Sequence, residues 1–440
     1  MHSSAVIARS LSTAFLAGEL EIDGMVDRAA YLLGRRYRWL QPLAVRVQET
    51  FGAGNRPGQA VLAKFLLADA GFARARQKCR LRVSNPVPFS PVMSSRGRPA
   101  SWDVPVLHTA AELADWLGIT YRSLMWFADR GSLELNRSNR RLRHYHYRVL
   151  AKRFGRVRLI EAPKPRLKQL QQRILGGLLQ QVPPHDAAHG FRRGRSIITF
   201  ATPHVGQRTV LKIDLEDFFP SISSKRVVAV FRTLGYPDDV ASLLAGLSTN
   251  AAPECVWQEL QAESGSWQTR DVRTRYSNVH LPQGAPTSPT LANLCAYRMD
   301  CRLSGLAASV GAAYTRYADD LVFSGDGQFE RCVQRFRHHV CATVMEEGFR
   351  VHTRKTRVMR QGVRQYVAGL VVNRHFNICR SDFDRLKAIL TNCLHHGPAS
   401  QNRSGHQDFR AHLSGRISFV EMVNPFRGGK LRTLFEQIEW

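Results

Sequence analysis

The tetrad Tyr317-Ala318-Asp319-Asp320 lies between two short apolar runs and constrains the local fold more than any other segment of the chain. Asp is unfavourable in strands, and neighbouring carboxylates on a regular strand would point to opposite faces. Only a tight turn between two strands lets both carboxylates reach one point. The tetrad therefore predicts a hairpin, whose tip is either solvated or an acidic site that binds a cation.

A third carboxylate follows a separate apolar run. Residues 210–213 predict a buried strand that ends at Asp214, and Glu216 lies close by as a weaker competing ligand. Carboxylate and phosphate oxygens are the ligands that Mg²⁺ prefers. Asp214, Asp319 and Asp320 are thus candidate ligands for two Mg²⁺ ions, with Mn²⁺ as a substitute. Such a pair of ions would activate a 3′-hydroxyl and stabilise a pyrophosphate leaving group.

The segment 281–289 separates the two acidic positions along the chain. Ser288 followed by Pro289 is typical of a helix N-terminus. Gln283 and Gly284, just before that helix, offer a side-chain amide and an unobstructed backbone to a planar base and its sugar. We expect this loop to bind a nucleotide.

The charge balance favours a polyphosphate partner. Lys and Arg number 63 against 35 Asp and Glu, which gives a formal net charge of +28. Each neutralised phosphate releases counterions, so excess positive charge on this scale suits a nucleic acid. A generally basic proteome would give a similar composition and remains the alternative.

Basic residues concentrate in two stretches. Residues 70–102 contain no acid and four prolines, and we expect a basic linker that is extended by itself. It either follows a nucleic-acid backbone or serves only as a tether. The second stretch covers residues 137–173. The candidate nucleic-acid contacts in the two stretches are Arg74, Arg76, Arg80, Arg153, Arg156 and Arg166.

The eight cysteines show no zinc-ligand spacing and are typical of reduced thiols. No apolar stretch is long enough to span a bilayer, and the N-terminus shows no convincing signal peptide. We therefore expect a cytoplasmic protein with no membrane contact.

Several sequence blocks, in this order, resemble the bacterial retron-type reverse transcriptases over about residues 106–440. The matching blocks are Leu159–Pro163 with Leu167–Leu170, His189–Phe191 with Gly194–Ile197, Asp214–Ile222, Gln283–Asn293, Tyr317–Asp320, His352–Thr356, and Ile417–Val420 with Val423–Pro425. The resemblance implies an RNA-directed DNA polymerase.

That family's fold would be α+β, a right-hand polymerase with fingers, a palm of antiparallel sheet plus helices, and a small helical thumb. We expect a mostly helical N-terminal extension over 1–104, including the linker 70–102. Fingers and palm would cover 105–365, and the thumb 366–440.

The resemblance also implies roles for individual residues. Asp214, Asp319 and Asp320 would be catalytic, with the Leu215 carbonyl assisting the metal ions. Phe219 would lie against C2′ of the incoming deoxynucleotide and exclude a 2′-hydroxyl. The remaining implied contacts are Gln283, Gly284, Arg158 and Lys355 with the nucleotide, and His204 with RNA or DNA.

The implied partners are a structured non-coding RNA that serves as template and primer, dNTPs, the RNA–DNA product, and an effector or toxin protein in anti-phage defence. Two elements depart from the retron pattern, Phe200–His204 before the first acid and Val367-Ala368-Gly369 near the thumb. A defence-associated reverse transcriptase outside the retrons therefore stays open. So does an RNA-binding scaffold that sequesters an effector without synthesis.

Overall fold

The computed structural model of the protein describes residues 3–18, 20–51, 57–79, 81–85, 93, 102–131, 133–136, 139–151, 157–258 and 275–440. This part of the chain is rich in helices and carries small antiparallel sheets, in agreement with the predicted α+β class. The chain divides into a first unit, residues 1–183 with 219–295, and a second unit, residues 184–218 with 296–440. These units cut across the expected boundaries at 104/105 and 365/366, which stay predictions.

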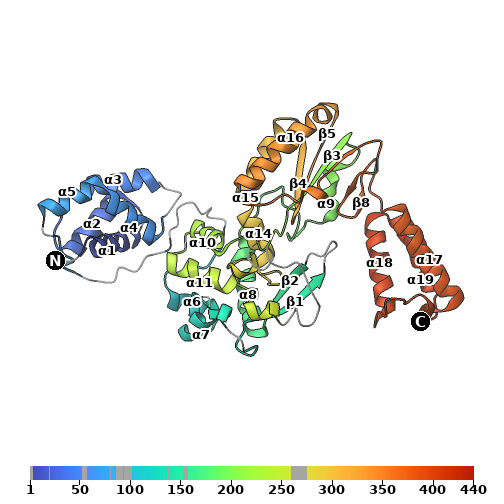
Figure 1. The fold of residues 1–440 in the computed structure, drawn as a ribbon, viewed down its shortest axis with the longest axis horizontal. Helices are drawn as coiled ribbons and strands as arrows, with labels where there is room; N and C mark the ends of the chain where they lie inside the picture. The colour runs from blue at the N-terminus through green and yellow to red at the C-terminus, as the bar shows by residue number, and fades with distance from the viewer. Residues whose placement is uncertain are drawn as a thin grey trace. The chain divides into compact units, whose positions relative to one another are not determined.

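The first unit begins with a helical bundle that buries its own apolar core (Figure 1). Phe15, Met25 and Leu40 are fully buried there, on helices whose apolar residues recur at helical spacing. The helices are α1 (Ser4–Leu16), α2 (Ile22–Leu33), α3 (Leu40–Phe51), α4 (Gln59–Ala68) and α5 (Ala70–Lys78).

Helix α5 corrects the expectation of an extended linker from residue 70. The Asp69 carboxylate accepts a hydrogen bond from the Phe72 N–H and so caps the helix N-terminus. Arg76 and Lys78 lie in the last turn, where positive charge is favourable beside the exposed carbonyls. Local capping and charge placement therefore make residues 70–78 helical. Residues 80, 86–92 and 94–101 of the expected linker lie outside the described residues.

The rest of the first unit packs helices around a two-stranded sheet and the loop that precedes α14. Its elements are α6 (Ala110–Leu117), α7 (Tyr121–Ala128), β1 (Tyr145–Ala151), β2 (Val157–Pro163), α8 (Pro165–Gly177), α10 (Ser224–Thr233), α11 (Asp238–Ser248) and α14 (Ser288–Cys295). Strands β1 and β2 are antiparallel, with Tyr145 opposite Pro163.

The second unit is built on a four-stranded antiparallel sheet with strand order β4-β5-β3-β6. Its strands are β3 (Thr209–Asp214), β4 (Ala313–Tyr317), β5 (Asp320–Gly325) and β6 (Arg357–Arg360). The register places Asp214 directly opposite Asp320. The predicted strand ending at Asp214 is therefore confirmed, and its end meets the start of β5.

Helices cover both faces of this sheet. Because side chains alternate along a strand, Leu211 and Phe323 point to one face, while Asp214 and Asp320 point to the other. The first face packs on α15 (Tyr297–Ala308) and α16 (Gly327–Glu346), and the second on α9 (Ile197–Ala201) and the short helix η4 (Thr202–His204). Figure 1 shows α15 and α16 running along the sheet.

Three helices follow the sheet at the C-terminal end of the second unit. A small hairpin of β7 (Tyr366–Val367) and β8 (Leu370–Val371) precedes α17 (Arg380–His396), α18 (Phe409–Val423) and α19 (Pro425–Glu436). Leu390, Ile417 and Leu431 are fully buried and give these helices a shared core.

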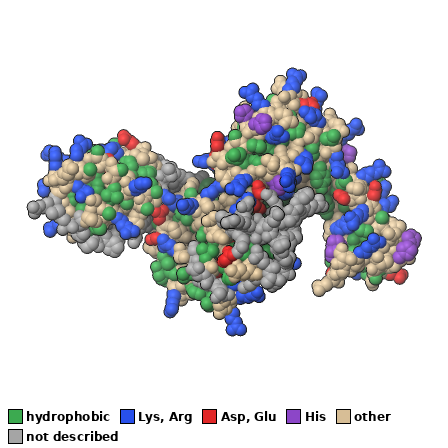
Figure 2. All heavy atoms as spheres, viewed as in Figure 1, with side chains coloured by type: hydrophobic (Ala, Val, Ile, Leu, Met, Phe, Trp, Pro, Cys, Tyr) green, Lys and Arg blue, Asp and Glu red, His purple; other side chains and the backbone are tan. Residues whose placement is uncertain are grey.

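Positive charge is widespread on the surface. In Figure 2, Lys and Arg side chains are scattered over the visible face, with few acids between them. No helix in the described ranges is both long and apolar enough to cross a bilayer.

Candidate active site

The acidic tetrad forms the tip of the β4–β5 hairpin. Tyr317 pairs with Asp320, so Ala318 and Asp319 alone make the turn. Ala318 adopts the left-handed region at φ 54°, as a two-residue hairpin requires. The Asp320 side chain is only 21% exposed, and the Asp319 carbonyl accepts a hydrogen bond of 2.8 Å from the Leu215 N–H. The hairpin is therefore fastened to the end of β3, which does not fit a solvated tip.

Two lysines compensate part of the negative charge. Lys355 Nζ lies 3.0 and 3.1 Å from the two carboxylate oxygens of Asp214. Lys212 Nζ lies 2.9 Å from Asp320 Oδ2. The second oxygen, Asp320 Oδ1, is buried and has no hydrogen-bond partner. An unpartnered carboxylate oxygen in such a place is costly unless a cation approaches it.

The pKa values of the carboxyl groups in the turn also indicate that their negative charge is only partly compensated. Burial raises the pKa of Asp319 above its ordinary value, and the neighbouring Asp214 and Asp320 carboxylates raise it further. Burial likewise raises the pKa of Asp320, although Lys212 opposes that shift. The two lysines therefore neutralise the carboxylates only in part.

The carboxylates fit a divalent cation that shares its coordination with a substrate. Within the described ranges, no three Asp, Glu, His or Cys side chains are already drawn together into a complete metal cage. Mg²⁺ often takes only one or two carboxylates and completes its shell with waters and phosphate oxygens. Asp214, Asp319 and Asp320, with the unpartnered Asp320 Oδ1, suit that open kind of site.

The expected nucleotide loop lies against strand β2 in the first unit. The Gln283 carbonyl accepts a hydrogen bond of 2.9 Å from the Glu161 N–H. Gly284 has φ 136°, and a Cβ there would lie 2.8 Å from the Glu161 carbonyl oxygen, so only glycine fits. Ser288 Oγ donates to the Pro282 carbonyl at 2.7 Å and ties the loop to the start of α14. The loop is thus held at both ends.

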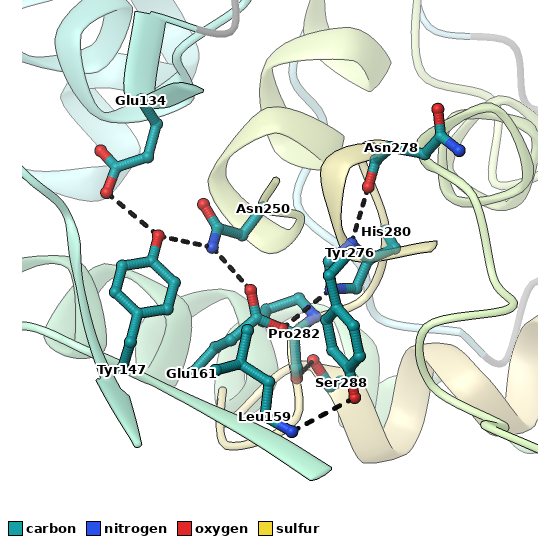
Figure 3. A network of polar contacts seen from close by, with 10 residues as sticks. All are labelled: Glu134, Tyr147, Leu159, Glu161, Asn250, Tyr276, Asn278, His280, Pro282 and Ser288. Carbon is teal, nitrogen blue, oxygen red and sulfur yellow. Dashed lines mark hydrogen bonds and ion pairs between the residues drawn. The ribbon is translucent and has the colours of Figure 1, made fainter. Parts of the chain in front are cut away.

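A buried polar network continues from this loop (Figure 3). The Glu161 side chain is fully buried, and its two oxygens lie 2.8 Å from His280 Nε2 and 2.8 Å from Asn250 Nδ2. Asn250 Nδ2 also donates to the Tyr147 hydroxyl, which in turn donates to Glu134. Every oxygen of the Glu161 carboxylate therefore has a partner.

His280 is charged in this network. Its Nε2 faces the Glu161 carboxylate, and its Nδ1 lies 2.7 Å from the Asn278 carbonyl, so both ring nitrogens face acceptors and must donate. Burial opposes the charge, but the Glu161 carboxylate outweighs burial and raises the pKa of His280. The ion pair is fully enclosed by the first unit.

The remaining candidate residues are divided between the units. In the first unit, Phe219 and Arg158 are half-buried, and Arg158 Nε is a buried atom without a hydrogen-bond partner. Arg74, Arg76 and Arg166 are exposed on helices. Arg80, Arg153 and Arg156 lie outside the described residues.

His204 corrects the expectation of a nucleic-acid contact. Its ring is fully buried, with Nδ1 2.7 Å from Ser324 Oγ and Nε2 2.7 Å from Thr315 Oγ1. Burial lowers the pKa of His204 to about 3, so the ring is neutral. Because hydroxyls of the sheet occupy both nitrogens, His204 joins η4 to β4 and β5 and has no atom left for RNA.

Sequence reasoning missed Lys212 and Glu161. Lys212 is two residues before Asp214 on a strand and therefore shares its face, a signal that the sequence did contain. Glu161 gave no comparable signal, because its partners His280 and Asn250 are 119 and 89 residues away along the chain.

Comparisons with known proteins show the family of the chain. Residues 150–376 match the family described as reverse transcriptase (RNA-dependent DNA polymerase). The retron Mx65 reverse transcriptase of Myxococcus xanthus is 40% identical over 339 residues, which cover 76% of this chain and 72% of that protein.

Two further relatives carry related names. The retron Mx162 reverse transcriptase of Myxococcus xanthus is 36% identical over 76% of this chain and 67% of its own length. The retron Ec86 reverse transcriptase of Escherichia coli is 32% identical over 64% of this chain and 77% of its own length. The family match over residues 150–376 includes both acidic positions and the loop between them.

Proposed function

The chain belongs to the retron-type reverse transcriptases and is an RNA-directed DNA polymerase, and on that premise we propose that it copies part of a cognate structured non-coding RNA into single-stranded DNA. The observation that carries the proposal is the acidic hairpin beside β3. It brings Asp319 and Asp320 to Asp214 and leaves one buried carboxylate oxygen without a partner.

We assign the parts of a right-handed polymerase to this fold. The four-stranded sheet with α15 and α16 is the palm, and the β1–β2 hairpin belongs to the fingers. Helices α17 to α19 form the thumb, from about residue 366, and residues 1–104 form an N-terminal extension. The sheet order and the position of the acids on one sheet face support this assignment.

The three aspartates and the Leu215 carbonyl are proposed to hold two Mg²⁺ ions, for which Mn²⁺ is a substitute. Bound Mg²⁺ supplies positive charge to the attacking 3′-oxygen and to the leaving pyrophosphate. The chain contributes the fixed turn that orients the carboxylates. We propose that Lys355, whose Nζ contacts Asp214, releases this carboxylate and binds the triphosphate when a nucleotide enters.

We propose that the loop of Gln283 and Gly284 contacts the incoming dNTP, with Phe219 excluding a 2′-hydroxyl and Arg158 binding phosphate. The fixed backbone of the loop on β2 supports the first role, because a rigid platform binds a planar ligand with little entropy loss. The buried, unpartnered Nε of Arg158 supports the last, because it is a donor in need of an acceptor.

The RNA partner is proposed to bind the basic surface. The exposed Arg74, Arg76 and Arg166 contribute to it, and the net charge of +28 supports a polyanionic partner. We also propose a cytoplasmic location, because all eight cysteines are free thiols. In the cell, the RNA–DNA product would act with an effector or toxin protein in anti-phage defence.

Primer extension on an RNA template tests the polymerase assignment to these residues. The purified protein is given Mg²⁺ and dNTPs beside the double variant Asp319→Ala, Asp320→Ala, with folding of both checked by circular dichroism. Wild type should extend the primer, and the variant should not. Equal product from both would refute the assignment of catalysis to Asp319 and Asp320, and no product from either would favour an RNA-binding scaffold.

The nature of the partner RNA needs a separate test. Nucleic acid that copurifies with the protein is treated with RNase, DNase and debranching enzyme. Sensitivity to both nucleases indicates an RNA–DNA product, and a change with debranching enzyme indicates a branched one. RNA alone, without attached DNA, would favour a reverse transcriptase outside the retrons or a scaffold.

A further inference from the structure

A buried ion pair lies behind the catalytic hairpin, on the sheet face opposite the carboxylates. Arg316 and Asp300 both have fully buried side chains. Arg316 Nε and Nη2 lie 2.8 and 2.7 Å from the two oxygens of Asp300, which is the bidentate geometry of a strong pair. The Tyr314 hydroxyl donates to the same carboxylate at 2.8 Å. Asp300 lies on α15, so the pair fastens strand β4 to that helix.

The same guanidinium also reaches the turn itself. Arg316 Nη1 donates to the Ala318 carbonyl at 3.2 Å, two residues further along the chain. Ala318 is the left-handed residue of the hairpin, and a non-glycine residue pays a conformational cost there of order 1 kcal/mol. A hydrogen bond to its carbonyl favours the orientation of the peptide that leads into Asp319. The turn is thus held by a group that is itself held by α15.

The backbone around Arg316 restricts the turn from the other side. The Arg316 N–H donates to the Ala187 carbonyl at 2.7 Å, and its own carbonyl accepts from the His189 N–H at 2.8 Å. A Cβ at position 190 would lie 2.7 Å from the Ala318 nitrogen, so Gly190 allows the neighbouring chain to approach the turn closely. These contacts restrict the backbone at Ala318, and the hydrogen bond from Arg316 to its carbonyl restricts it further.

We propose that Arg316 and Asp300 are positioning residues, which fix the Ala318–Asp319 peptide and thereby the direction of the two metal-binding carboxylates. They touch neither substrate nor metal, since they lie on the other sheet face. Because partners behind metal ligands commonly change metal affinity about 10- to 100-fold when removed, we expect an effect of that size on Mn²⁺ binding. The inference rests on the proposed metal role of Asp214, Asp319 and Asp320.

A purely structural ion pair would stabilise the fold without affecting metal binding. The structural role and the positioning role can therefore be separated by experiment. Replacing a buried pair by apolar residues of similar volume is often neutral for stability. The triple variant Asp300→Leu, Arg316→Met, Tyr314→Phe removes the pair and the hydroxyl that depends on it. It should keep a Tm near wild type yet still bind Mn²⁺ weakly, because the Ala318 carbonyl has lost its donor.

The test measures Mn²⁺ binding by electron paramagnetic resonance, without RNA or nucleotide, together with Tm and the kcat and KM of primer extension. The milder variant Arg316→Lys keeps the charge but cannot contact Asp300 and Ala318 together. We expect its Mn²⁺ Kd to rise about 10- to 100-fold and its kcat to fall, with the KM for dNTP unchanged. Arg302→Lys is the matched control, because Arg302 lies on α15, as Asp300 does, and its 41% exposed side chain pairs with Glu347 at 2.8 Å.

The outcomes are decisive. Wild-type Mn²⁺ affinity in Arg316→Lys would overturn the proposal, whether or not the triple variant folds. A triple variant whose Tm and Mn²⁺ affinity both equal those of wild type would also overturn it. If Asp319→Asn also leaves Mn²⁺ binding unchanged, the metal assignment itself fails. If only that variant loses binding, the metal site stands and the positioning role fails.

Discussion

Two acidic groups of this protein that are largely shielded from solvent have opposite surroundings. In the first unit, both oxygens of Glu161 are partnered, by a charged His280 and by Asn250. In the second unit, Asp214 and Asp320 have one lysine each, and Asp320 Oδ1 has no partner at all. Both groups are largely shielded from solvent, so shielding alone does not mark a candidate active site. Incomplete partnering distinguishes the carboxylates of the proposed metal site from Glu161, which is fully partnered.

The largest expected effect comes from neutralising the incompletely partnered group. Asp319→Asn should reduce primer extension on the order of 10³-fold, because it removes a charge that the transition state requires. The raised pKa of Asp319 means that its ionised form costs stability at neutral pH. The Tm of the variant should therefore equal or exceed that of wild type. A lower Tm would show that the carboxylate is structural.

Breaking the fully partnered group should act on stability instead. Glu161→Ala leaves a buried imidazolium without its counter-charge, and such losses cost roughly 3–5 kcal/mol. Urea unfolding measures the change in free energy. Asp239→Ala is the control, because that acid is paired with Arg130 on the surface with a side chain 76% exposed. A Glu161→Ala protein as stable as the control would remove the distinction between the two groups.

The two buried histidines should respond to pH in opposite directions. His204 stays neutral when folded, with a pKa of about 3, but protonates near 6.5 when unfolded. Its contribution to stability is therefore lost as pH falls, by about 2 kcal/mol between pH 7.5 and 5.0. His280 has a raised pKa, so its contribution is present below 6.5 and is lost as pH rises through the folded value.

Urea unfolding of wild type and two variants, His204→Gln and His280→Gln, separates these contributions. The stability difference between wild type and His204→Gln should shrink on acidification. The difference between wild type and His280→Gln should shrink as the pH rises through the raised folded pKa of His280. Identical pH dependence in all three proteins would contradict both assignments.

The smallest effect is expected from Lys212→Met. Lys212 occupies one oxygen of Asp320 and competes with a cation for it. Its loss should lower the Mg²⁺ concentration for half-maximal extension a few-fold, equivalent to about 0.5–1 kcal/mol. A higher Mg²⁺ requirement would show instead that Lys212 orients the carboxylate.

The sequence predicts those parts of the candidate site that depend on neighbouring residues. The alternation before Asp214 and the two acids after Tyr317 predict a strand end and a turn from neighbouring residues alone. The prediction fails where partners are remote. The residue type of His204 is the same whether its ring contacts RNA or two hydroxyls. Only its partners Thr315 and Ser324, more than 100 residues away along the chain, show which of the two it contacts.

Remote partners also explain why the sequence does not reveal the residues that support the site. Arg316 precedes the acidic turn directly, yet nothing local shows that it points behind the sheet to Asp300. The expected linker failed for a different reason, since Asp69 lies just before it and caps a helix within it. Composition alone could not reveal that cap.

The discontinuous second unit has a consequence for folding kinetics. Residues 219–295 of the first unit are inserted between β3 and the β4–β5 hairpin, so Lys212 and Asp320 are 108 residues apart in the chain. Closing so long a loop delays pairing, whereas the hairpin itself forms locally and fast. During synthesis, Asp214 leaves the ribosome well before its partners exist. We therefore expect the acidic site to assemble late, after the inserted segment has had time to fold.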